Sequence, residues 1–139
     1  MTAHIDPTEA QGRALFRRGI EGPVVMLNLL RFREVADYSA APALAPAAPV
    51  SGRAAFERYI AEARPHLEAA GGEILFMGDG GALFIGPEAE RWDLAMLIRQ
   101  PSVAAFFAHA GNEAYMASVA HRSAALEEAR LLPLVERGR

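Results

Sequence analysis

The chain has 139 residues, 52% of them hydrophobic and 22% charged, with a net charge of -3, which predicts one domain over 1–139 that buries about two-thirds of its unfolded surface. The absence of cysteine excludes disulfides and thiolate metal sites, and the scattered basic residues argue against nucleic acid. The chain has neither the roughly 20 consecutive apolar residues of a membrane span nor a signal peptide, so we expect a cytoplasmic protein.

The first part of the chain predicts a short helix, a buried strand and a loop. Asp6 and Pro7 suit the cap and the first turn of a helix over 6–18. The nearly continuous apolar run over 23–32 is typical of a strand covered on both faces. Residues 36–50 are rich in alanine and proline and have no periodicity, so we expect an extended arm or a loop.

A long amphipathic helix follows this loop. Its apolar residues recur at spacings of three and four from the cap Ser51 to the glycines at 71–72, and Pro65 inside it predicts a kink. Short strands are then predicted over 73–77 and 82–85, with a glycine-rich turn or bulge between them.

The last third of the chain predicts a strand, a long helical region and a final strand. The strand covers 92–98, and a helical pattern with an interruption at 111–112 covers 103–129. Residues 131–135 contain Pro133, which restricts them to an edge strand or an irregular strand because proline has no N–H group to donate.

This order of elements predicts an α+β fold of the ferredoxin-like βαββαβ type, preceded by an extra helix, with helices on one face of an antiparallel sheet. The strand over 23–32 is apolar on both faces, but helices can cover only one of them. The hydrophobic share of 52% also exceeds the usual value of about 45–50%. We therefore expect a homodimer in which two sheets pack face to face.

Two polar side chains occupy positions where the pattern predicts burial. Asn28 lies in the middle of the most apolar strand, on the face of Met26 and Leu30, so its amide needs either main-chain partners or a substrate carbonyl. Arg122 lies on the apolar stripe of the last helix, where an unpaired charge is costly. Its partner is either Asp93 or an anionic or carbonyl-bearing ligand that its planar fork can bind.

His121 and Tyr115 are the candidate groups for proton transfer. His121 lies either on the surface or at the rim of a helix–sheet cleft, where a pKa near neutrality suits an acid or a base. Tyr59 and Tyr115 occupy the inner stripes of their helices, either as core aromatics or in one polar cluster with Asn28 and Arg122.

Other kinds of chemistry have little support in the sequence. Glu62 and His66 form an acid–histidine pair at helical spacing, but they lie on a predicted solvated face, so we expect no metal site. No Gly-x-Ser-x-Gly motif and no paired carboxylates point to nucleophilic hydrolysis.

Short motifs along 23–135 are similar to those of a known family. They are Val-Met-Leu-Asn-Leu-Leu-Arg-Phe at 25–32, Phe56-x-x-Tyr59, the glycines 71, 72 and 78, Trp92-Asp93, Pro101-Ser102-x-x-x-Phe106, and Tyr115 followed by Arg122. Together they resemble the Domain of Unknown Function 1330 family of the dimeric α+β barrel superfamily. The resemblance implies a ferredoxin-like subunit whose sheet closes a barrel with that of its partner.

The resemblance also bears on the chemistry. The superfamily includes cofactor-free monooxygenases, lactone isomerases, dehalogenating or decarboxylating enzymes, and haem proteins, with the pocket usually between sheet and helices. Neither His109 nor His121 matches a pattern for a proximal haem ligand, so we expect no haem and no other cofactor.

Taken together, the residues and the resemblance predict a small homodimeric enzyme, monooxygenase-like or isomerase-like, that acts on a carbonyl-bearing or anionic metabolite. Asn28 and Arg122 would orient this ligand, Asp93 would position Arg122, and His121 or Tyr115 would move a proton. Tyr59 would add a hydroxyl to the same site. The alternative is a non-catalytic dimeric module, ligand-binding or structural, in which these side chains bind only one another.

Overall fold

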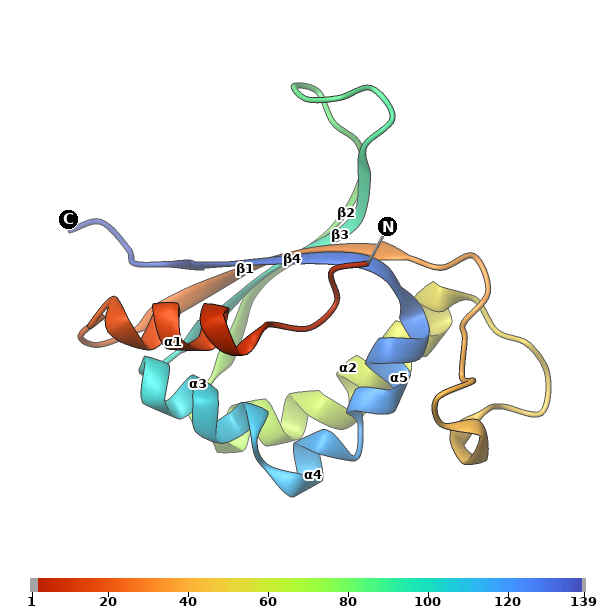
Figure 1. The fold of residues 1–139 in the computed structure, drawn as a ribbon, viewed down its shortest axis with the longest axis horizontal. Coiled ribbons are helices and arrows are strands. Elements are labelled where there is room, and N and C mark those ends of the chain that lie inside the picture. Colours follow the sequence, from red (N-terminus) through yellow and green to blue (C-terminus); the bar gives the residue numbers. More distant parts are fainter. Residues whose placement is uncertain (1–2, 139) are drawn as a thin grey trace.

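The computed structural model describes residues 3–138 and shows helices packed on one face of a four-stranded antiparallel sheet (Figure 1). The strands lie in the order β2-β3-β1-β4, and each neighbouring pair is antiparallel. With α2 between β1 and β2, and α3 to α5 between β3 and β4, this is the ferredoxin-like βαββαβ arrangement, so the predicted α+β fold is confirmed. The strands are β1 (Val24–Phe32), β2 (Glu73–Ala82), β3 (Arg91–Gln100) and β4 (Leu126–Leu134).

The helices begin at side-chain caps, one of which differs from the prediction. Thr8 rather than Asp6 caps α1: its hydroxyl accepts from the Gln11 amide, and the Gln11 side chain accepts from the Thr8 amide. The predicted cap Ser51 is confirmed, because its hydroxyl accepts from the Ala54 amide at the start of α2. The helices are α1 (Glu9–Arg17), α2 (Gly52–Ala69), α3 (Val103–Ala110), α4 (Glu113–Met116) and α5 (Val119–Ala125).

The predicted turn between residues 77 and 82 is wrong, because β2 is continuous through its glycines. Gly80 pairs so closely with β3 that a Cβ there would collide with the Trp92 carbonyl. The glycines therefore permit the pairing instead of ending it. The chain turns beyond Ala82, and Figure 1 shows this hairpin projecting away from the helices. Phe84 and Ile85, between β2 and β3, are highly exposed.

The predicted helix over 103–129 is too long at its C-terminal end. The last helix ends at Ala125, and β4 starts at Leu126, which pairs with Phe32 of β1 across a register shift. The open edge of β1 supplies a ladder of main-chain partners, and this pairing overrides the local helical pattern. Pro133 lies in β4, which is an edge strand as predicted.

The two faces of β1 differ in their burial. Val24, Met26 and Leu30 are buried under the helices. The alternate positions Val25 and Leu27 are only half-buried, and the other face of the sheet carries an apolar surface that the described residues leave uncovered. Among residues 3–138, no helix combines the length and the apolar content needed to cross a bilayer.

Residues 36–50 form a closed loop that is anchored to the helices. The Ala36 amide donates to the Val50 carbonyl (2.9 Å), which brings the two ends of the loop together. The Asp37 amide donates to the Ala124 carbonyl of α5 (2.9 Å), and a 3₁₀ turn spans Pro42–Leu44. These bonds hold one end of the loop against the C-terminal part of α5.

Candidate functional site

His121 contacts a tyrosine and a carboxylate through its two ring nitrogens. Its Nδ1 is 2.7 Å from the Tyr38 hydroxyl, and its Nε2 is 3.0 Å from a Glu62 carboxylate oxygen. The contact with Glu62 is an ion-pair contact, and a negatively charged neighbour at this distance favours the neutral tautomer with its hydrogen on Nε2. In the neutral ring, Nδ1 is therefore the acceptor for the Tyr38 O–H group. The result is a directed chain, which we call the Tyr38–His121–Glu62 relay.

Three separate elements build this relay. The loop over 36–50 supplies Tyr38, α5 supplies His121 and α2 supplies Glu62. Tyr38 and His121 are 8% and 7% exposed, which shields the hydrogen bond between them from water, whereas Glu62 stays about half exposed. The rings of Tyr38 and His121 meet edge to face, with their centroids 5.6 Å apart.

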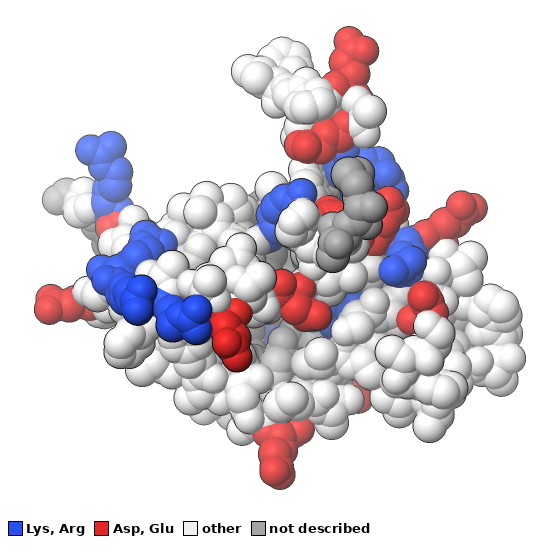
Figure 2. Space-filling model, viewed as in Figure 1, with Lys and Arg blue, Asp and Glu red and all other residues white. Residues whose placement is uncertain are grey.

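Tyr38 forms part of the wall of two pockets. One, of about 450 Å³, is an open hollow lined by residues of the loop, most of them alanine, proline and valine. The other, of about 360 Å³, lies between the loop and the helices α4 and α5; we call it the loop–helix pocket. Asp37 is the one charged residue of 36–50, and Figure 2 shows the surface over the loop as largely uncharged.

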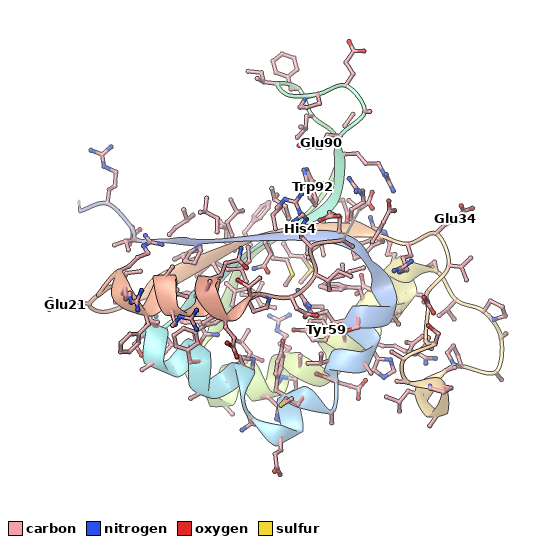
Figure 3. The ribbon with its side chains drawn as sticks, in the orientation of Figure 1. His4, Glu21, Glu34, Tyr59, Glu90 and Trp92 are labelled. Carbon is pink, nitrogen blue, oxygen red and sulfur yellow. The ribbon has the colours of Figure 1, made fainter. Side chains whose placement is uncertain are left out.

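A second polar cluster joins α2 to α4. The hydroxyls of Tyr59 and Tyr115 are 2.7 Å apart, and the His109 ring lies against Tyr115 with centroids 4.4 Å apart. Figure 3 shows Tyr59 on the helix side of the sheet. Burial is the main cause that raises the pKa of Tyr59, and the neighbouring Tyr115 adds to this shift. Burial is also the main cause that lowers the pKa of His109, and the nearby His66 lowers it further. The hydroxyl of Tyr59 and the ring of His109 are therefore uncharged at neutral pH.

Asn28 lies on the helix-covered face as predicted, opposite the buried Met96 of β3. Its side-chain amide donates to the Met26 carbonyl (3.1 Å). No hydrogen bond within the described part of the chain joins Asn28 to the tyrosine pair. The expected polar cluster therefore contains Tyr59 and Tyr115 without Asn28.

The predicted Asp93–Arg122 pair is wrong. The Arg122 guanidinium donates to the Ile5 carbonyl (2.9 Å) and lies 3.4 Å from an Asp6 oxygen. Asp93 instead accepts from the Phe32 amide of β1 (2.8 Å) and lies near Arg91. The physical reason is that the N-terminal segment runs beside the start of β4, where the His4 carbonyl accepts from the Ala129 amide (2.7 Å).

The structure thus divides the predicted site residues among separate places. Tyr59 and Tyr115 meet, and Arg122 is close enough to act on the pKa of Tyr59. His121 belongs to the relay, and neither of the two pockets is lined by Asn28, Tyr59, Asp93 or Arg122. No group of three potential metal ligands occurs within residues 3–138.

The sequence did not point to Tyr38 as a functional residue. It lies in a loop without periodicity, so no local signal places it beside a histidine 83 positions away. Glu62 did carry a signal, because its helical spacing pairs it with a histidine on α2. That pairing suggested His66, but the partner in the structure is His121 from another helix.

The chain was compared with known proteins. No family model matches it, and no curated protein matches it significantly. One solved structure that it resembles is the crystal structure of the RPA0582 protein of unknown function from Rhodopseudomonas palustris, a structural genomics target. That protein is 36% identical over 99% of this chain and 100% of its own, with a TM-score of 0.83. The chain belongs to the family of this protein.

A second structure of the same protein leads to the same assignment. The methylated RPA0582 protein is 37% identical over 100% of both chains, with a TM-score of 0.84. Likeness of this extent shows a shared fold over the whole length of the chain. The RPA0582 protein is itself described as of unknown function, so membership of its family assigns no activity. The resemblance to the Domain of Unknown Function 1330 family stays a prediction.

Proposed function

We propose that this protein is an enzyme whose own side chains move a proton on a small carbonyl-bearing or anionic metabolite, and that the Tyr38–His121–Glu62 relay is the proton-transfer group. The observation that carries the proposal is that both nitrogens of a buried histidine are engaged, one by a carboxylate and one by a phenol at a pocket wall. A histidine with an oriented tautomer is a ready general base.

The relay moves protons in a balanced sequence. A proton leaves the ligand for the phenol oxygen of Tyr38 while the Tyr38 hydrogen passes to Nδ1 of His121. The phenol is thus regenerated, and the ring becomes an imidazolium that the ionised Glu62 stabilises through Nε2. The reverse transfer returns the proton to the same or to another atom of the ligand. Such a sequence supports isomerisation or exchange at a carbon next to a carbonyl.

The test is hydrogen exchange into the ligand. The protein is incubated in D₂O with a panel of small 2-oxo acids, lactones and quinones, and loss of the carbon-bound proton is followed by NMR. We expect His121→Asn to slow exchange by about a hundredfold or more, since general acid–base catalysis is worth at least that much. The matched control His66→Asn lies outside the relay and should keep the full rate.

Two results would overturn the proposal. One is an exchange rate of His121→Asn equal to that of the unsubstituted protein. The other is the absence of exchange with every compound of the panel. Exchange that depends on Tyr115 and Arg122 but not on His121 would instead place the chemistry between the sheet and the helices.

The proposed assembly is a homodimer through the uncovered sheet face. Phe76 and Leu132 are 56% and 54% exposed, and Val25, Leu27 and Leu97 are half-buried. Contiguous apolar area of this kind is characteristic of an interaction surface, and a two-fold pair of identical faces is the commonest symmetry.

Light scattering at micromolar concentration tests the dimer. Leu132→Glu should give a monomer, because two buried carboxylates would oppose each other across the interface. Leu131→Glu, at the next position of the same strand and also exposed, should stay dimeric because its side chain points to the other face. A monomeric mass for the unsubstituted protein would contradict the proposed assembly.

A non-catalytic module is the second candidate function. It is favoured by Arg122 and Asn28, whose donors bind main-chain carbonyls of the chain itself. This alternative predicts no exchange activity and an unchanged dimer in the His121→Asn variant.

A further inference from the structure

We propose that the loop–helix pocket binds a small monocarboxylate with a short apolar chain, and that Arg33 is the residue that holds its carboxylate. The inference deepens the proposed function by naming the ligand class, and it rests on that function only for what happens to the ligand after binding. The observations that support it are the fixed position of Arg33, the buried Nε of its guanidinium that has no hydrogen-bond partner, and the composition of the pocket wall.

The main chain of Arg33 is held from two sides directly after β1. Its amide donates to the Ala125 carbonyl (2.8 Å), and its carbonyl accepts from the Gly52 amide (3.0 Å). A Cβ at position 52 would collide with the Arg33 carbonyl and lie 2.6 Å from the Ala125 carbonyl, so only glycine permits this close packing. The start of α2 and the end of α5 therefore fix where the Arg33 side chain begins.

The Arg33 side chain has an unsatisfied donor. Its Nε is buried and has no hydrogen-bond partner within residues 3–138. The Nε of Arg31 also has no hydrogen-bond partner, but it lies 3.5 Å from a Glu127 oxygen. Arg53 is 2.9 Å from an Asp79 oxygen, and Arg122 donates to the Ile5 carbonyl. A buried guanidinium donor without an acceptor is costly, which favours an acceptor brought by a ligand.

The wall of the pocket combines one cation with an apolar surface. Arg33 and Ser39 contribute polar groups from the loop side, while Met116 and Val119 present apolar groups from the helices. The volume of about 360 Å³ is at the lower end for small-molecule sites. An anionic head on Arg33 with a short hydrocarbon chain against the helices satisfies both parts of this wall.

The charges of the wall favour a carboxylate over a phosphate. Asp37 lines the same pocket, and the pKa of its carboxyl is lowered, first by hydrogen bonds from Ser39 and to a smaller extent by Arg33. Asp37 is therefore ionised at neutral pH and would repel a dianion. A single carboxylate matches the planar fork of one guanidinium, which can bind both of its oxygens.

The position of Tyr38 connects this binding site with the relay. Arg33 and Tyr38 line the same pocket, so a ligand whose carboxylate binds Arg33 shares this pocket with the tyrosine of the relay. A 2-oxo acid is then the ligand class that fits both binding and chemistry.

The test measures binding separately from exchange. Propionate, pyruvate and inorganic phosphate serve as probes, titrated by calorimetry and by NMR shifts of the α5 amides. Arg33→Gln should weaken propionate and pyruvate binding by at least about tenfold, which is about 1.4 kcal/mol. Arg58→Gln, an exposed arginine on α2, is the matched control and should bind as the unsubstituted protein does.

A second variant tests the pocket independently, for the case in which Arg33→Gln does not fold. Ala120→Leu fills the pocket from α5 without touching Arg33, and it should also abolish propionate binding. Unchanged binding in both variants, or phosphate binding tighter than propionate, would overturn the inference. A His121→Asn variant that binds propionate and retains full exchange would refute the proposed function and leave the Arg33 site standing.

Discussion

Replacement of Tyr38 by phenylalanine tests whether the relay anchors the loop over 36–50. The substitution keeps the ring, and therefore its packing, but removes the hydroxyl that donates to His121. With both residues less than a tenth exposed, Nδ1 of His121 is left without a partner in a place that water reaches poorly. A buried unsatisfied group of this kind costs about 1–3 kcal/mol.

This cost should appear locally, because the hydroxyl holds a loop and not the sheet. The Asp37 amide is protected by its bond to the Ala124 carbonyl, and the Ala36 amide by its bond to the Val50 carbonyl. If the loop opens more often by the full amount, their hydrogen exchange accelerates by about 5- to 150-fold. The amides of the buried part of β1 should exchange at the unchanged rate.

Hydrogen exchange measured by NMR at single residues distinguishes these regions. Tyr115→Phe is the matched control, because it removes one hydroxyl from the separate pair with Tyr59. It should leave the exchange of Asp37 and Ala36 unchanged. Equal acceleration in the loop and in β1 after Tyr38→Phe, or no acceleration in either, would refute the anchoring role.

Three further substitutions test the packing and the polar clusters. Gly52→Ala should lower the free energy of unfolding by about 1–3 kcal/mol or more in urea denaturation, whereas Gly12→Ala, with nothing within 4 Å, should not. Burial raises the pKa of Tyr59 in the folded state above 10.0. The free energy of unfolding should therefore fall as the pH rises above about 10, where only the unfolded state ionises. Tyr59→Phe should remove part of this fall, and a pH profile identical to that of the unsubstituted protein would contradict the prediction. Arg122→Gln removes the contacts to Ile5 and Asp6 and should speed proteolysis before α1 while the unfolding midpoint moves little.

The elements that the sequence predicts well are those whose signal is local. The apolar run of β1 and the regular spacing of apolar residues in α2 each reflect burial of the element itself, and the Ser51 cap satisfies donors within the same turn. Pro133 limited the last strand to an edge or an irregular strand, and the structure places it at the edge. Each of these conclusions needs only neighbouring residues and the energetics of burial.

The errors arise where a distant partner decides between two local possibilities. Residues 126–129 continue a helical pattern, but the edge of β1 pairs with them as a strand. The glycines before Ala82 suggest a turn, yet they allow the close pairing with β3. Local propensity differs little between such alternatives, so main-chain pairing with another segment determines the outcome.

The candidate site shows the same division. The sequence by itself predicted an α+β protein with Tyr59, Tyr115 and Arg122 on apolar stripes, where polar side chains must find partners. It placed His121 on the surface or at the rim of a cleft, which is wrong because this side chain is buried. Only the tertiary structure decided which partners these are. Burial creates the need for a hydrogen bond within one element, but the choice of Tyr38 and Glu62 for His121, or of Ile5 for Arg122, depends on how segments far apart in the chain come together.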